Sequence, residues 1–205
     1  MKGVIKNINK ERTLVIIKPD GVQRSLIGEI IQRYERTGLK LLAMKMEIPQ
    51  ASTIEKHYTV NPEWLYNVGT KSIEAYRKKG INPPSENPID IGKATLERLK
   101  SYMTSGPVIC MCWEGMNAIG VVRKITGGTE PLTSDVGTIR GDFTIDSYEI
   151  ADTTGRSVRN LIHASGNKEE ADKEIDLWFA KEELMKYRLF NEVVLYDTNL
   201  DGILE

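Results

Sequence analysis

The chain has 205 residues, which is enough to bury a core and is most simply one domain with additions. Its 28 basic and 29 acidic residues give a net charge of -1, which offers no general attraction to nucleic acid or to an anionic membrane. The apolar run from Leu14 to Ile17 stops at Lys18, so it is too short for a signal sequence or a membrane span. We therefore expect a cytoplasmic enzyme or binding protein.

Strand and helix patterns alternate in the first part of the chain. Thr13 to Ile17 predicts a strand, and Pro19-Asp20-Gly21 predicts a turn directly after it. Apolar residues at helical spacing from Ile27 to Tyr34 predict a helix that ends near Gly38. Residues 42–48 alternate between apolar and charged side chains, which predicts a strand whose buried face is formed by Leu42, Met44, Met46 and Ile48.

The middle of the chain continues this alternation. Ser52 and Glu55 suggest a capping box for a short helix that carries His57 and Tyr58. An apolar stripe from Leu96 to Met103 predicts another helix, and Val108 to Trp113 is apolar enough for a central strand. Two cysteines share one face of that strand and are poorly placed to bridge each other, so they are interpreted as core residues in a reducing compartment: Cys110 and Cys112.

The last regular elements surround a histidine. Ala118 to Ile125 predicts a helix stopped by Gly127-Gly128, and Val158 to Ile162 predicts a strand that ends at His163. A helix follows, with Asn167 at its N-cap and Glu170 three residues later.

The order of these elements predicts an α+β fold, a ferredoxin-like βαββαβ sandwich. We expect a four-stranded antiparallel sheet covered by helices on one face, with a parallel α/β fold as the weaker alternative. Residues 1–205 would form a single domain with its core over 11–187 and with insertions at about 61–90 and 146–156. The first insertion should hold a short helix near residues 70–79. In the C-terminal tail, 188–205, Val193 to Tyr196 could add a strand or bind a neighbouring subunit.

His163 is the first candidate for chemistry. Imidazole can be a neutral nucleophile near pH 7, and a strand end beside a helix N-terminus is a place where anions are easily held. Glu174 lies on the following helix, where its carboxylate could fold back onto one ring nitrogen and leave the other free to attack. The alternative is a lone polar residue at a strand end.

Other candidates for anion binding stand at the ends of the predicted elements: Lys18, Tyr58, Arg123, Thr129 and Arg140. Thr129 and Arg140 bracket a loop that could cradle an anion, and the arginine fork suits two phosphate oxygens. Each residue alone also has a simpler explanation, such as a solvated strand end or a helix surface charge. Neither G-x-x-x-x-G-K-[ST] nor G-x-G-x-x-G occurs, so nucleotide binding would need another architecture.

Five motifs, in family order over most of Glu11 to Tyr187, resemble nucleoside diphosphate kinase. They are Thr13 to Arg24 with Lys18-Pro19-Asp20-Gly21, Ser105 to Val108, Gly137 to Phe143, Asn160 to Ser165, and Glu174 to Phe179.

The resemblance implies transfer of a γ-phosphate from a nucleoside triphosphate to a nucleoside diphosphate, by a ping-pong mechanism through a phosphohistidine. His163 would attack through Nδ1 while Glu174 hydrogen-bonds Nε2, with Ser165 as a hydrogen-bond partner near Glu174. The phosphates would be bound by Arg123, Arg140 and Thr129, the γ-phosphate side by Tyr58, and the ribose hydroxyls and phosphates by Lys18 and Asn160. Mg²⁺ would bridge phosphate oxygens, with no side chain named as its ligand.

Departures from the family pattern affect the base and the assembly. Trp64 and Tyr66 are rival residues for stacking on the base, and we expect Trp64 to do so. The family assembles as a hexamer or tetramer built from dimers, so a homo-oligomer is expected, with no nucleic acid or membrane partner. His57 is left outside the site.

Two other classes were weighed. A nucleotide-binding regulator of the same fold, without transfer activity, would retain binding alone. A nucleic-acid-binding sandwich would need basic and aromatic residues on exposed strands, whereas Val108 to Trp113 offers one tryptophan and no positive charge.

Overall fold

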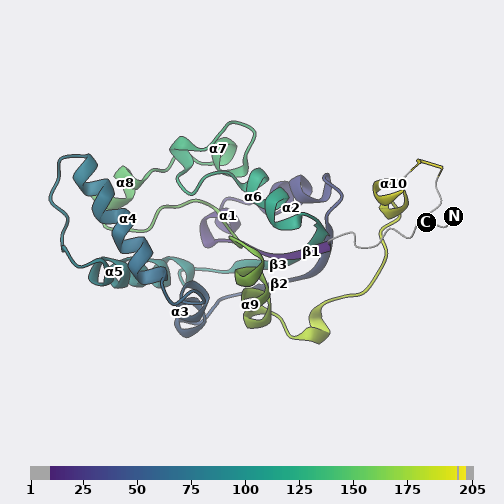
Figure 1. Cartoon of the computed structure of the whole chain (residues 1–205), viewed down its shortest axis with the longest axis horizontal. Helices are drawn as coiled ribbons and strands as arrows, with labels where there is room; N and C mark the ends of the chain where they lie inside the picture. Colours follow the sequence, from purple (N-terminus) through teal and green to yellow (C-terminus); the bar gives the residue numbers. More distant parts are fainter. Residues whose placement is uncertain (1–9, 198, 202–205) are drawn as a thin grey trace.

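A single four-stranded sheet organises the molecule. The computed structural model describes residues 10–197 and 199–201, and Figure 1 shows the elements along the chain. The strands are β1 (Lys10–Ile17), β2 (Lys40–Glu47), β3 (Val108–Met116) and β4 (Ile162–Ala164). Their order across the sheet is β2-β3-β1-β4, and every neighbouring pair is antiparallel. The predicted α+β sandwich with an antiparallel sheet is confirmed.

Helices connect and cover the strands. They are α1 (Pro19–Gln23), α2 (Ile27–Glu35), α3 (Ala51–Tyr58), α4 (Trp64–Lys78), α5 (Pro88–Met103), α6 (Ala118–Thr126), α7 (Ile139–Phe143), α8 (Tyr148–Thr153), α9 (Lys168–Trp178) and α10 (Glu192–Tyr196), with 3-10 turns η1 (Pro131–Thr133) and η2 (Lys181–Glu183). Within the described part of the chain, none of these helices has the length and apolar character needed to cross a membrane.

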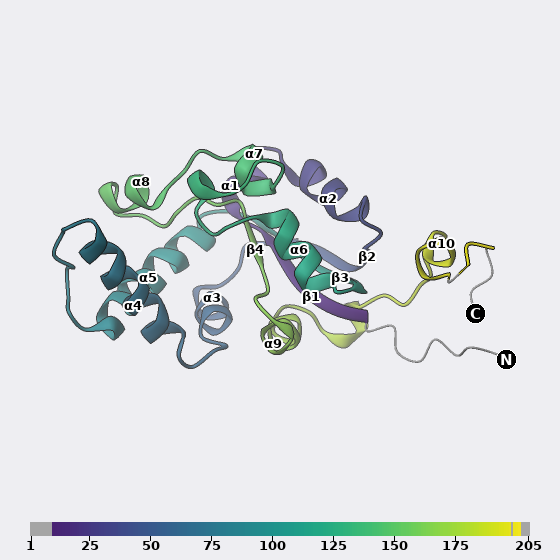
Figure 2. The same cartoon turned by 45° about the horizontal axis from the view of Figure 1, so that its top comes forward.

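The sheet is covered on both faces, whereas one covered face was predicted. On one face, Val15 and Ile17 of β1 pack with α2 and α6 around the buried ring of Tyr34. On the other face, Leu14 and Ile16 pack against α3, α5 and α9, which lie opposite α2 and α6 in Figure 2. Because successive side chains of a strand point to opposite faces, β1 is buried on both sides and forms the centre of the fold.

The edge strand β2 departs from the predicted pattern. Its pairing with β3 shifts register between Leu41 and Ala43, so the strand carries a bulge at Leu42. Leu42 and Ala43 are both buried, but Met44 and Met46 are 53% and 57% exposed. A bulge inserts one residue and thereby switches the face to which later side chains point. The predicted buried face is therefore wrong beyond Leu42, including Ile48, which is also exposed.

Two predictions are wrong at places where helices begin. Pro19-Asp20-Gly21 opens the short helix α1 instead of a turn, since proline at the first helical position and an acidic residue in the first turn both favour a helix start. Helix α3 has Gln50 at its N-cap with no side-chain capping bond, so the proposed capping box is absent and Ser52 lies inside the helix.

The first insertion is more regular than predicted. Helix α4 begins at Trp64 instead of near residue 70, because Asn61 accepts a hydrogen bond from the Glu63 backbone N–H and its carbonyl accepts one from Trp64. Such a local turn at Asn61 positions the chain to enter a helix. The polar stretch at residues 146–156 likewise contains a helix, α8, whose first turn is capped by Ser147.

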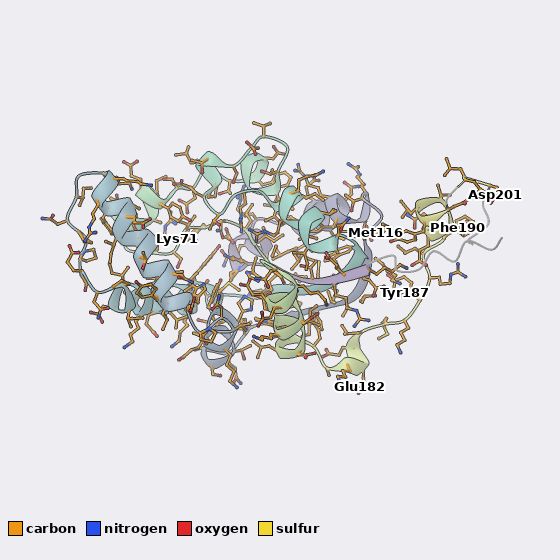
Figure 3. All side chains as sticks on the ribbon, in the orientation of Figure 1. Lys71, Met116, Glu182, Tyr187, Phe190 and Asp201 are labelled. Atoms are coloured by element: carbon orange, nitrogen blue, oxygen red, sulfur yellow. The ribbon has the colours of Figure 1, made fainter. Side chains whose placement is uncertain are left out.

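The C-terminal segment returns to the edge of the sheet. Met185 N–H donates to the Leu42 carbonyl at the bulge (2.8 Å), and the Tyr187 hydroxyl donates to the Leu41 carbonyl (2.6 Å). Figure 3 labels Tyr187 and Phe190 on this segment, and Phe190 is fully exposed. Val193 to Tyr196 belongs to helix α10, so the strand alternative for the tail is wrong.

Helices α4 and α5 pack so closely that two glycines are required. A Cβ atom on Gly69 would overlap the backbone carbonyl of Pro88, and one on Gly92 would overlap that of Leu65. Neither carbonyl can move aside as a flexible side chain would. The crossing of these helices is therefore fixed by the absence of side chains, and it holds the start of α4, at Trp64, in place.

We expect Gly92→Ala to destabilise the protein by about 1–3 kcal/mol, because the added methyl group must separate two packed backbones. Gly120→Ala is the matched control, since it also lies in a helix but has open space around the new Cβ. The control should be neutral or stabilising by up to about 1 kcal/mol. Thermal unfolding measures both, and equal midpoints for the two variants would contradict this packing.

Candidate active site

The chain around His163 makes an irregular turn before it enters the sheet. Strand β4 begins only at Ile162, and Leu161 has a positive φ of 64°. The Ile162 N–H donates to the Asn160 carbonyl (2.7 Å), closing a tight γ-turn at Leu161. The predicted strand is therefore wrong over residues 158–161, because this turn takes the place of a regular strand, and only its end at Ile162 and His163 is confirmed. His163 is the middle residue of the short strand and pairs with Ile16 of β1.

A buried carboxylate holds the His163 ring. Glu174 Oε1 lies 3.0 Å from His163 Nε2, and Ser165 Oγ donates to Glu174 Oε2 at 2.6 Å. Burial alone would raise the pKa of Glu174, but the charge and hydrogen bond of His163 outweigh it and lower that pKa to about 2. An ionised carboxylate can only accept, so His163 must carry its proton on Nε2. The Nδ1 lone pair is then available as a nucleophile, which agrees with the predicted pairing of these residues.

Helix α9 positions Glu174 through its own cap. The Asn167 side chain accepts from the Glu170 N–H (2.9 Å), as predicted, and fixes where the helix starts. Ser165 in turn accepts a hydrogen bond from the Leu14 N–H of β1 (3.1 Å). The carboxylate is thus tied to the central strand as well as to β4.

Lys18 stands as a buried cation at the end of β1. Its Nζ donates to Asn160 Oδ1 (2.7 Å), and Asn160 Nδ2 donates to the Thr129 carbonyl (2.8 Å). Burial first, and then the charge of Arg140, lower the pKa of Lys18 from its ordinary 10.5 to about 7, with Asp20 opposing them. The predicted residues Lys18, Asn160 and Thr129 therefore form one hydrogen-bonded chain.

Arg140 is buried and holds the surrounding backbone together. Its guanidinium donates to four carbonyls: Asn160 (3.1 Å), Gly127 (3.0 Å), Gly128 (2.8 Å) and Ile162 (2.6 Å). Gly127 has a φ of 88°, a conformation that favours glycine, which presents its carbonyl at the end of α6. A guanidinium has five N–H groups, so these bonds leave one for another acceptor.

The remaining predicted residues lie around this centre. The Tyr58 ring lies 6.4 Å from the His163 ring and 5.4 Å from the Trp64 ring, between centroids. Tyr58 Oη is buried, with no hydrogen-bond partner among the described residues. Arg123 is exposed on α6. Burial of Arg140 is the main cause that lowers the pKa of Arg140 to about 10, and the charge of Arg123 adds to this lowering.

Two contributors were missed in the sequence. His57 is buried with its ring centroid 4.3 Å from that of His163, and its spacing of three from the buried Ile54 was a signal for an inward-facing position. Asp20 accepts from the Tyr102 hydroxyl (2.6 Å) and from the Leu161 N–H (3.2 Å), so it holds the tight turn in place. Nothing in the local pattern around Asp20 indicated those distant partners.

Among the described residues, one trio has the donor types and proximity of a metal site: His57, His163 and Glu174. Glu174 is already hydrogen-bonded to His163, and His57 already accepts a hydrogen bond from Trp178. Two imidazoles are also poor ligands for Mg²⁺, which prefers oxygen. The trio is therefore better described as a hydrogen-bonded nucleophile than as a magnesium site.

The fold and site together define an α+β sandwich that presents an oriented histidine beside buried cations. The family profile described as Nucleoside diphosphate kinase matches residues 11–68 and 89–184. A nucleoside diphosphate kinase of Pyrobaculum aerophilum is 44% identical over 180 residues, covering 86% of this chain and 98% of the relative. The chain belongs to the nucleoside diphosphate kinase family.

Solved structures agree with this assignment. A crystal structure of an NDP kinase from Pyrobaculum aerophilum matches with a TM-score of 0.83 and 42% identity, covering 86% of this chain and 100% of that one. A transition-state mimic of nucleoside-diphosphate kinase from Borrelia burgdorferi, with bound vanadate and ADP, matches with a TM-score of 0.74 and 36% identity, covering 92% and 98%. The family profile leaves residues 69–88 unmatched, which lie within the predicted first insertion.

The buried Lys18 should destabilise the fold in a pH-dependent way. Its pKa in the folded state is below the ordinary value, so the unfolded chain binds more protons between about pH 7 and 10.5. The free energy of unfolding of the wild type should therefore fall as the pH is lowered through this range. Lys18→Met should not show this fall. We expect the advantage of Lys18→Met to grow from about pH 10 to about pH 7, reaching a few kcal/mol, and then to level off.

Chemical denaturation at a series of pH values measures this difference. Lys124→Met, which removes an exposed lysine of α6, is the control and should parallel the wild type. A constant difference between Lys18→Met and the wild type across the range would show that Lys18 keeps an ordinary pKa.

Proposed function

We propose that this protein transfers the γ-phosphate of a nucleoside triphosphate to a nucleoside diphosphate through a phosphohistidine on His163. The observation that carries the proposal is the hydrogen bond between His163 Nε2 and the buried Glu174 carboxylate. It supports Nδ1 as the nucleophile because it leaves the lone pair on that nitrogen. Family membership supports the choice of nucleotides as donor and acceptor.

The transfer takes place in two displacements. First, the Nδ1 lone pair forms a bond to the γ-phosphorus while the bond from that phosphorus to the bridging oxygen breaks, and the nucleoside diphosphate leaves with the electron pair. The positive charge that develops on the ring is stabilised by Glu174 through the Nε2–H. In the second displacement, a terminal phosphate oxygen of another nucleoside diphosphate attacks the phosphohistidine and His163 regains its lone pair. Ping-pong kinetics follow from these steps.

Buried and exposed cations bind the phosphates. Lys18 has a lowered pKa in the free protein, but an anionic phosphate next to it raises that pKa and keeps the amine charged. The N–H group that remains on Arg140, the exposed Arg123 and the Thr129 side chain provide further contacts. Lys18 and Asn160 also contact the ribose hydroxyls, and Tyr58 lies on the γ-phosphate side.

The divalent cation in this proposal is Mg²⁺, held by the nucleotide. The site supplies cations to the phosphates. Its described carboxylate, Glu174, is already hydrogen-bonded to His163 and Ser165, so it is not available to hold the ion. When bound to the phosphate oxygens, Mg²⁺ neutralises charge on the transferring group. This fits residues whose own task is to orient the phosphates and the nucleophile.

The base is proposed to stack on Trp64. Trp64 is the first residue of α4, its ring lies against that of Tyr58, and the residue is only partly buried, so part of it is accessible to a ligand. Stacking on an aromatic ring reads no base edge, which explains acceptance of different bases.

We also propose a homo-oligomer, a hexamer or tetramer built from dimers, located in the cytoplasm. The exposed methionines of edge strand β2, Met44 and Met46, support an interface there, because exposed apolar side chains favour association. The two buried, unbridged thiols support a reducing compartment.

Incubation with γ-labelled ATP and Mg²⁺ should label the protein on an acid-labile, alkali-stable bond. His163→Ala should lose the label by a factor of at least about 10³, because the proposed nucleophile, the His163 Nδ1 lone pair, is removed. Adding GDP or CDP should discharge the label as the matching triphosphate.

Radioactivity on the isolated protein and thin-layer analysis of the nucleotides measure both steps. Absence of label on a protein that still binds ATP would overturn the proposal and favour a regulator without transfer activity. Label that persists in His163→Ala would place the nucleophile elsewhere.

A further inference from the structure

A second histidine lies against the nucleophile and has no part in the transfer described above. His57 of α3 is 2% exposed, and its ring meets the His163 ring at 79° with centroids 4.3 Å apart. It also packs edge-on against Tyr58, at 4.9 Å. A titratable ring in such close contact with a nucleophile affects that nucleophile through its own protonation.

Trp178 determines where the proton of His57 resides. The indole Nε1–H donates to His57 Nδ1 at 3.2 Å, across 121 positions of sequence. An indole nitrogen is a donor only, so Nδ1 must be the unprotonated nitrogen and the proton of the neutral ring lies on Nε2. His57 Nε2 is buried and has no hydrogen-bond partner among the described residues. Leaving the Nε2–H buried without a partner costs free energy. The tautomer with its proton on Nδ1 must therefore cost more.

The reverse tautomer would disturb the catalytic carboxylate. His57 Nδ1 lies 3.8 Å from Glu174 Oε1, the oxygen that accepts from His163 Nε2. A proton on Nδ1 would make His57 a second donor directed at that oxygen, in competition with His163. Weakening the bond to His163 would release its tautomer and reduce the availability of its own Nδ1 lone pair.

The surroundings also keep His57 uncharged. Burial first, and then electrostatic repulsion from His163 on β4, lower the pKa of His57 to about 3, while Glu174 on α9 opposes them and Lys18 after β1 adds to the lowering. Tyr58 faces His57 on the same helix, and burial keeps its hydroxyl protonated because it raises the Tyr58 pKa well above the ordinary range. The ring is therefore neutral throughout the usual working pH.

We propose that Trp178 and His57 form a tautomer lock: the indole N–H keeps His57 Nδ1 unprotonated and so reserves Glu174 for His163 during phosphate transfer. Both are positioning residues that act through Glu174, and the inference rests on the proposed transfer through His163. Replacing Trp178 and replacing His57 should have different consequences. Loss of Trp178 frees His57 to donate to Glu174, whereas loss of His57 removes the rival donor itself.

The test compares the wild type with Trp178→Phe, His57→Phe and the double variant. The rate of phosphoenzyme formation from Mg²⁺-ATP is measured in a single turnover from about pH 5 to 9. Trp178→Phe should be slower by about tenfold, the value of one hydrogen bond to a charged group. It should also show an acid limb additional to any that the wild type shows, because a new donor contact with Glu174 raises the pKa of His57. The double variant should recover most of this loss and show no such limb.

The recovery separates a lock from simple packing. If the double variant is as slow as Trp178→Phe, or slower, the lock is wrong and the indole only fills space. Thermal unfolding of each variant verifies that the rates come from folded protein. Replacing both partners by apolar rings leaves no unsatisfied indole or imidazole, so the double variant should be no less stable than either single variant.

The tautomer of His57 can also be measured directly by NMR, which tests the lock independently of phosphate transfer. The chain has two histidines, so ¹⁵N-histidine NMR resolves each ring. His57 Nδ1 should be unprotonated in the wild type and should become protonated in Trp178→Phe as the pH is lowered. An unchanged His57 spectrum in Trp178→Phe would overturn the lock. A wild type that shows the expected His57 tautomer but forms no phosphoenzyme would instead overturn the proposed function and, with it, the role given to the lock in transfer.

Discussion

The buried carboxylate of Glu174 is the constraint on which the site depends. It accepts hydrogen bonds from His163 on β4 and from Ser165 at the end of that strand, while Ser165 accepts from Leu14 on β1. An ionised group inside a protein is tolerated only when it is fully hydrogen-bonded, so each of these bonds is needed for the others. The same bonds attach α9 to the sheet and orient the nucleophile. Folding the helix against the strands and preparing the imidazole for attack are therefore one event.

The cationic end of the site, where the phosphates are proposed to bind, has the opposite character. Lys18 and Arg140 are buried cations whose partners are neutral oxygens, the Asn160 side chain and backbone carbonyls. Neutral partners do not compensate a buried charge fully, and the lowered pKa of Lys18 expresses that deficit. In the proposed function, an incoming polyphosphate would supply the missing negative charge. In the proposed transfer, the stability that these buried charges cost the free protein would be recovered as affinity for the phosphates.

Much of the fold could be predicted because it follows from local periodicity. Most strand and helix patterns, the Asn167 cap and the position of Glu174 on the helix after His163 could be predicted from the sequence. The bulge at Leu42 and the γ-turn at Leu161 were not, since each depends on how the segment pairs with distant strands. The importance of His57 was hidden for the same reason. Its direction is fixed by Trp178, far away in the sequence, and an isolated histidine beside a tyrosine gives no sign of that contact. The roles assigned to the individual site residues stay predictions.

The central claim is that Glu174 directs the chemistry to one nitrogen of His163. The most direct measurement is to prepare the phosphoenzyme from ¹⁵N-histidine-labelled protein and locate the phosphorus–nitrogen bond by NMR. The account predicts phosphorus on Nδ1, with Nε2 still protonated and bound to the carboxylate. Phosphorus on Nε2 would contradict it, because that nitrogen could react only after its hydrogen bond to Glu174 had been broken.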